Sequence, residues 1–283
     1  MKLFLAAALF AASVSSAIAA DSVPKYAASD APATKAIHLP ADPQSDILRG
    51  AVAKPDFASR DHRIAARLQN GEAIVEVGYH KPAQGELGGK FIAAWTKQAN
   101  GAWALAAYAD NPAVVSLHEQ TAAAKDTSLS VSSKVAPHPA ALDDVYVRMR
   151  RAYVDLDGAV LKSVYAPDGW YISRSSKAPV ESAQGAFVPG VSKFIEQSRS
   201  NGTTMDIAFR LTDRQVLSPN VVVDAGYVEF VMKPGDGKPE RRSTAKFLTV
   251  LTRQADGGWA FWADTASDTP AENWARGDGR AVG

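Results

Sequence analysis

Residues 90–104 read KFIAAWTKQANGAWA, and residues 246–260 read KFLTVLTRQADGGWA. The two stretches share Lys, Phe, Thr, Gln, Ala, Gly, Trp and Ala in register, and the exchanges of Ile for Leu, Lys for Arg and Asn for Asp keep the side-chain chemistry. Self-similarity of this kind indicates that one structural unit is present twice.

A second matched pair lies upstream of these stretches. Residues 73–79 read AIVEVGY, and residues 221–227 read VVVDAGY. The offset between the copies grows from 148 at the glycines to 156 at the last tryptophans, so the hairpin between the matched runs is eight residues longer in the second copy. At the first offset, a helix that opened the first copy would fall on the N-terminal residues of the chain. We therefore expect the first copy to lack its opening helix.

Apolar and polar residues alternate in short runs separated by turn residues, which is typical of antiparallel strands. The predicted strands of the first copy cover residues 63–68, 73–80, 89–98 and 103–109. In the second copy, helical spacing predicts helices over residues 142–159, 160–165 and 188–199. Alternation there predicts strands over residues 169–173, 206–214, 221–232, 243–253 and 258–266. Asn100-Gly101 and Asp256-Gly257 are strong hairpin signals. The order indicates an α+β fold, duplicated, with a truncated first copy.

The N-terminus has the pattern of an export signal. Residues 1–20 hold one Lys, then an apolar run, then small residues with an A-x-A cleavage pattern. We expect a signal peptide over residues 1–20 and a periplasmic or secreted protein. The further expected divisions are an incomplete cone-type unit over 21–112 with one short helix over 45–52, a linker over 113–139, a complete unit over 140–272 and a tail over 273–283.

Composition excludes several classes of function. The chain has no Cys, so it forms no disulfide, thiol nucleophile or thiolate metal site. Its net charge is +1 with both signs interspersed, which argues against a nucleic-acid partner. No apolar run after the signal is long enough for a membrane span. The five histidines are scattered and form no metal motif, and neither a phosphate loop nor a nucleophile elbow is present. We expect no metal and no cofactor.

Residues 140–266 resemble the nuclear transport factor 2-like superfamily, in particular its SnoaL-like and ketosteroid isomerase homologue domains. The resemblance is carried by DLDGA at 155–159, YAPDGWY at 165–171, Gly226-Tyr227, and RQADGGW at 253–259 followed by Asp264. It implies a cystatin-like cone, in which a curved antiparallel sheet wraps over N-terminal helices and leaves an apolar cavity. Ketosteroid isomerases use such a cavity with an Asp base and an oxyanion hole of Tyr and protonated Asp.

Asp264 is the candidate base. Alternation along the last strand places Trp259, Phe261 and Ala263 on one face, and Trp262 and Asp264 on the other. Asp264 then faces the cone, where burial raises the pKa of a carboxyl. The alternative is a carboxylate bonded to a neighbouring loop or helix end.

Tyrosines are the candidate oxyanion donors. Tyr227 and Tyr79 are matched between the copies, and Tyr171 follows the YAPD motif. We consider Tyr227 or Tyr171 as the donor beside Asp264, with a place in the core or at the rim as the alternative for the repeated Tyr227.

The candidate ligand-binding residues are Trp170, Tyr171 and Trp262, because aromatic side chains can line a cavity; aromatic residues on strands also commonly belong to the core. The matched acids Glu76 and Asp224 alternate with apolar neighbours, so we expect both on the solvent face.

Three functions stay open at this point. The first is an exported tandem protein that binds a small apolar or amphipathic molecule, as a monomer or weak homodimer whose two units set sheet against sheet. The second is an isomerase or dehydratase that works by proton transfer. The third is a cell-envelope interaction module with a filled cone and a large exposed apolar sheet face.

Overall fold

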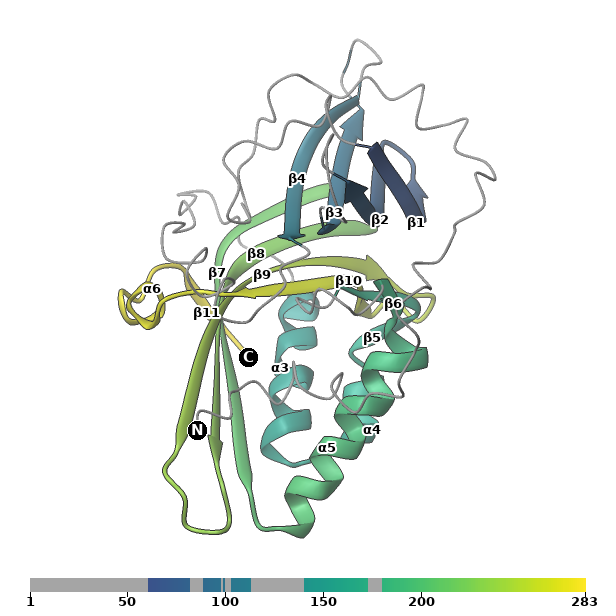
Figure 1. Ribbon diagram of the computed structural model, residues 1–283. Coiled ribbons are helices and arrows are strands. Elements are labelled where there is room, and N and C mark those ends of the chain that lie inside the picture. The colour runs from purple at the N-terminus through teal and green to yellow at the C-terminus, as the bar shows by residue number, and fades with distance from the viewer. Residues whose placement is uncertain (1–60, 82–88, 98, 100–102, 113–139, 173–179) are drawn as a thin grey trace.

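The computed structural model describes residues 61–81, 89–97, 99, 103–112, 140–172 and 180–283 (Figure 1). The predicted signal peptide, the helix over 45–52, the linker over 113–139 and the Asn100-Gly101 turn lie outside the described residues.

The first half of the described chain is a four-stranded sheet. Its strands are β1 (Asp61–Asn70), β2 (Ala73–Lys81), β3 (Gly89–Lys97) and β4 (Trp103–Pro112). They pair in the order β1-β2-β3-β4, each antiparallel to the next. The predicted meander is confirmed, with β1, β2 and β4 longer than predicted by one to four residues and β3 shorter by one.

Helices open the second half. They are α3 (Ala140–Val154), α4 (Gly158–Lys162), the π-helical turn η5 (Ala183–Phe187) and α5 (Val188–Ser200). The predicted helix over 142–159 is wrong at its end, because Leu156 has a positive φ of 52° and Asp157 caps a separate helix by accepting from the Ala159 amide at 2.9 Å. The predicted helix over 160–165 is wrong as well, since α4 ends at Lys162 and Tyr165 begins a strand.

A seven-stranded sheet completes this half, with α6 (Ala271–Ala275) before its last strand. Its strands are β5 (Tyr165–Ile172), β6 (Val180–Ser182), β7 (Thr204–Ser218), β8 (Val221–Lys233), β9 (Arg241–Arg253), β10 (Trp259–Asp268) and β11 (Arg280–Val282).

The strand order is β11-β7-β8-β9-β10-β5-β6, and every pair is antiparallel except β10 with β5. The Asp256-Gly257 hairpin is confirmed by the Gly257 φ of +84°. Residues 273–283 are not a separate tail, because β11 pairs with the β7 edge and Val282 is buried in the core.

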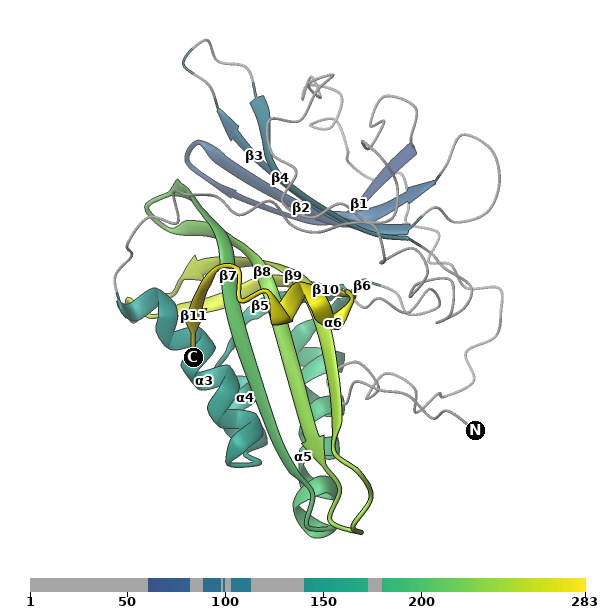
Figure 2. The ribbon, with the colours of Figure 1, turned by 90° about the vertical axis from the view of Figure 1, so that its left-hand side faces the viewer.

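The long strands bend around the helices. Figure 1 shows α3, α4 and α5 on the inner side of the bend, and Figure 2 shows the first sheet lying across the opposite side of β7 to β10. Buried side chains from α3, α5 and the strands form a core between helices and sheet. The predicted α+β cone is confirmed for this half of the chain.

The two sheets pack face to face. Their common apolar layer contains Ala73, Val75 and Val77 of β2 together with Val221, Val223 and Ala225 of β8. These are the matched positions of the repeated AIVEVGY and VVVDAGY segments. The two matched segments therefore place the same three of their positions in the layer between the sheets.

The expectation that Glu76 and Asp224 face solvent is wrong. Glu76 is 4% exposed and Asp224 is 0% exposed. Each pairs with the arginine opposite it on the neighbouring strand: Arg67 Nε donates to Glu76 at 2.7 Å, and Arg214 Nε donates to Asp224 at 2.6 Å. Alternation distinguishes the two faces of a strand, but it does not say whether both are covered.

The two matched ion pairs differ in how deeply the arginine is buried, which predicts different costs of breaking them. Arg214 has a side-chain exposure of 0%, whereas Arg67 has 21%. We expect Asp224→Ala to lower the free energy of unfolding by about 2–4 kcal/mol, because a fully buried arginine then keeps only Asp143 as an acidic partner. Glu76→Ala is the matched control, with a loss of about 1–2 kcal/mol because water reaches Arg67. Chemical denaturation measures both, and equal losses would contradict the difference.

Candidate functional site

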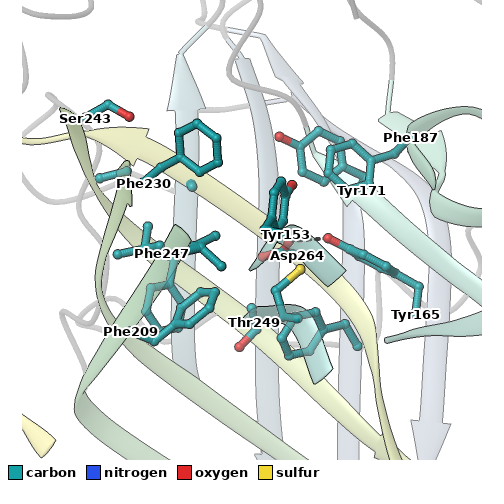
Figure 3. A pocket seen from close by; sticks show the side chains of 16 residues that line it. Tyr153, Tyr165, Tyr171, Phe187, Phe209, Phe230, Ser243, Phe247, Thr249 and Asp264 are labelled. Atoms are coloured by element: carbon teal, nitrogen blue, oxygen red, sulfur yellow. Dashed lines mark hydrogen bonds between the residues drawn. The ribbon is translucent and has the colours of Figure 1, made fainter. Parts of the chain in front are cut away.

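A pocket lies between the helices and the bent sheet of the second half. The space among its lining side chains is about 640 Å³ when the open solvent at its mouth is counted. Phe, Tyr and aliphatic side chains form most of the wall, including Met149 of α3, Phe187 of η5, Phe209 of β7, Phe230 of β8 and Phe247 of β9 (Figure 3). A pocket with this lining suits a small, largely apolar ligand.

Asp264 of β10 is the only charged side chain among the described residues that line this pocket. The Tyr165 hydroxyl donates a hydrogen bond to Asp264 Oδ2 at 2.7 Å (Figure 3). Burial raises the pKa of Asp264 to about 6, although this hydrogen bond and one from the Thr265 amide act in the opposite direction. A carboxyl with this pKa can exchange a proton near neutral pH.

A β-bulge points Asp264 into the pocket. The register between β10 and β9 shifts between Phe261, opposite Leu251, and Ala263, opposite Val250. Trp262 is therefore an extra residue on β10, and the alternation is reset behind it. The prediction that Trp262 and Asp264 share a face is wrong, because Asp264 faces the pocket together with Phe261 while Trp262 packs between the sheets.

Tyr153 of α3 places a second hydroxyl in the pocket (Figure 3). The residue is 1% exposed, and burial, followed by the charge of Asp264, raises the pKa of Tyr153 above its ordinary value. Within the described part of the chain this hydroxyl makes no hydrogen bond, whereas the hydroxyl of Tyr165 is already engaged by Asp264. Tyr153 is therefore a donor available to a ligand.

The sequence placed some of the candidate residues correctly and others wrongly. Tyr171 lines the pocket, stacked on Phe187 with ring centroids 3.7 Å apart. Tyr227 is wrong as a partner of Asp264, since it is 0% exposed in the layer between the sheets. Trp170 and Trp262 also pack in that layer rather than in the pocket, and Trp262 Nε1 donates to Asp168 at 3.1 Å.

The repeated Tyr79 does not lie in the pocket either. It packs against the layer between the sheets, and its hydroxyl accepts from the Val180 amide at 2.6 Å. Matched tyrosines thus serve the contact between the sheets, which is the alternative considered for them.

Sequence reasoning did not select Tyr153 and Tyr165 as site residues. Both lie in patterns that the sequence contains: Tyr153 belongs to the series Val145, Met149, Tyr153 and Leu156 at helical spacing, and Tyr165 begins the YAPD motif. The missing information was the parallel pairing of β5 with β10, which sets Tyr165 opposite Phe261 and brings its hydroxyl to Asp264.

A second polar cluster lies behind the pocket wall. Tyr146 of α3 donates to Asp224 at 2.8 Å and is hydrogen-bonded to Thr249, a pocket-lining residue, at 2.9 Å. Arg214 joins Asp224 to Asp143, which also accepts from Arg280 of β11 at 2.6 Å. This network fixes α3 and β11 to the sheet, so it stabilises the pocket wall.

The described residues contain no group of three or more His, Asp or Glu side chains placed to hold a metal ion. In the same part of the chain, none of the helices has the length and apolar character needed to cross a bilayer.

No protein-family model and no curated protein sequence matches this chain. Solved structures do match it. A ketosteroid isomerase-like protein from Erwinia carotovora atroseptica SCRI1043 is 13% identical, with 46% of this chain and 95% of that chain covered and a TM-score of 0.36. A nuclear transport factor 2 (NTF2-like) superfamily protein from Salmonella enterica serovar Typhimurium is 14% identical, with 46% of this chain and 89% of that chain covered and a TM-score of 0.35.

ActVI-ORFA from Streptomyces coelicolor is 15% identical, covering 46% of this chain and 93% of that chain with a TM-score of 0.39. Each of these three matches covers 46% of this chain.

Asp264 makes the stability of the fold depend on pH. Its folded pKa of about 6 lies above its ordinary value of 3.8, so the folded state binds the proton more tightly and its stability falls as pH rises from about 4 to 6. We expect Asp264→Asn to be more stable than the parent by about 1–2 kcal/mol at about pH 8, a value discounted because Asp264 is only partly buried by its surface exposure.

This gain should vanish at about pH 4, where the parent carboxyl is also neutral. Denaturation curves across this range test it, and a gain independent of pH would show that the substitution acts through packing instead.

Proposed function

We propose that the pocket beneath the bent sheet binds a small, largely apolar molecule with one polar group placed at Asp264. The observation that carries the proposal is the composition of the wall, in which a single carboxyl with a raised pKa stands among aromatic and aliphatic side chains. A carboxyl left in such a place is costly to the fold, which favours a functional role for it.

Binding can be tested with the uncharged fluorescent probe N-phenyl-1-naphthylamine. We expect saturable binding by the parent protein, and loss of it in Ala266→Phe, where the new ring occupies the pocket. Tyr227→Phe is the control, since Tyr227 lies between the sheets. Circular dichroism checks that both variants are folded. Equal binding by the parent and Ala266→Phe would place the probe elsewhere and contradict the proposal.

A second candidate function is proton transfer at a carbon next to a carbonyl. The observation that favours it is the pKa of about 6 at Asp264, together with the Tyr153 hydroxyl in the same pocket. Asp264 would take the proton, and Tyr153 would donate to the developing oxyanion. The assay is deuterium exchange into 2-tetralone, a bicyclic ketone, followed by NMR.

In that assay Asp264→Asn should reduce protein-dependent exchange about 100-fold or more. If the ketone binds but its exchange is no faster than in buffer, proton transfer is contradicted and ligand binding is the only function that stands.

We also propose that the protein is exported and that its two units arose by duplication. The composition of residues 1–20 supports export, and the matched segments that face the layer between the sheets support duplication. The first sheet covers the face through which a second copy could pair, which favours a monomer or weak homodimer. Mass measurement of protein recovered from the periplasm or medium tests export, because a mass that still includes residues 1–20 would contradict cleavage.

A further inference from the structure

We propose that the pocket selects uncharged ring compounds that carry a hydroxyl group over the matching ketones and carboxylates. This inference rests on the proposed function, because it names the ligand class of the same pocket. It follows from the charge and hydrogen-bond polarity of the groups that the wall presents.

The charge of the wall disfavours anions. Asp264 is the one charged side chain among the described lining residues, and no Lys, Arg or His accompanies it there. An anionic ligand would be desolvated in the pocket and repelled by the carboxylate without a counter-ion. A carboxylate head group is therefore a poor match for this wall.

The hydrogen bonds already formed at Asp264 determine what it can offer. Tyr165 has a single hydroxyl proton and donates it to Asp264 Oδ2 at 2.7 Å, and the Thr265 amide also donates to this carboxyl. An ionised carboxylate only accepts hydrogen bonds. A ligand group beside it must therefore be a donor, which a hydroxyl is and a ketone oxygen is not.

Tyr153 supplies the complementary donor. Its hydroxyl lies within the pocket, near enough for the charge of Asp264 to act on it, and forms no hydrogen bond inside the described part of the protein. A ligand oxygen can accept from it. Since a hydroxyl group both donates and accepts, it can use both kinds of site in this wall.

The selectivity depends on the protonation of Asp264. The other titratable groups that face the pocket are Tyr153 of α3 and Tyr165 and Tyr171 of β5, and burial raises the pKa of Tyr153 and Tyr165 further from neutral. When Asp264 takes up a proton, it can donate a hydrogen bond to a ketone oxygen. Hydroxyl selectivity is thus expected above about pH 6 and lost below it.

Three probes share a naphthalene ring and differ in their polar group, which is a hydroxyl, a ketone or a carboxylate: 2-naphthol, 2-acetylnaphthalene and 2-naphthoate. Affinities are measured by calorimetry at about pH 8 and about pH 5. At the higher pH we expect 2-naphthol to bind about tenfold more tightly than the ketone, with 2-naphthoate the weakest. At the lower pH the ratio of naphthol to ketone should fall to about twofold or less.

Three variants show which side chain causes the selectivity and its dependence on pH. Asp264→Asn should abolish the change with pH, because its amide has the same donor and acceptor at both values. Tyr153→Phe should weaken the binding of 2-naphthol several-fold, while the ratio of naphthol to ketone affinity still changes with pH. Tyr227→Phe, outside the pocket, should behave as the parent does.

The outcomes separate this inference from the function on which it rests. Equal binding of the three probes at both pH values, competed by N-phenyl-1-naphthylamine, would overturn the hydroxyl selectivity and leave the pocket as a binding site. If none of the three probes nor N-phenyl-1-naphthylamine binds, both proposals are overturned together.

Discussion

The second sheet is buried on both faces where the first sheet lies on it, and the rest of the structure depends on this constraint. Helices cover one face there and the first sheet covers the other. Polar side chains in the buried stretches 221–227 of β8 and 244–252 of β9 therefore cannot reach bulk water by alternation, as they do in a sheet with one solvated face. Asp224 and Lys246 illustrate the result, with exposures of 0% and 2%. Each buried polar group needs a partner or carries a shifted pKa.

The lysines at the repeated position carry shifted pKa values. Lys90 and Lys246 occupy the same position in the repeated stretch and are both buried. Burial lowers the pKa of Lys90 to about 7 and that of Lys246 to about 8. A Lys with a lowered folded pKa destabilises the fold most below that pKa, and the cost declines as pH rises toward its ordinary value. The packing of the two sheets thus tolerates a polar position that both copies share.

Sequence alone predicted the strands, the order of helices before sheet, and the cone. The reason is that these depend on local period and on turn chemistry, as at Asp256-Gly257. It predicted Asp264 and Tyr171 as pocket residues but assigned Tyr227, Trp170 and Trp262 to the wrong layer. Two non-local features account for the errors. They are the bulge at Trp262, which breaks alternation on β10, and the first sheet, which turns an outer face into a second core.

A comparison of two carboxyls of this sheet, Asp224 and Asp264, shows why Asp264 marks the site. Asp224 receives two hydrogen bonds from the Arg214 guanidinium and one from Tyr146, so its environment compensates the charge within the fold. Burial raises the pKa of both carboxyls, but Asp264 has only a tyrosine and a backbone amide as partners and no cation. The chain could hold Asp264 as it holds Asp224, with an arginine on the neighbouring strand, yet Thr249 stands opposite it on β9. A carboxyl kept at the edge of ionisation beside an open apolar space is incompletely satisfied by the protein itself, and a ligand that donates to it would supply the missing partner.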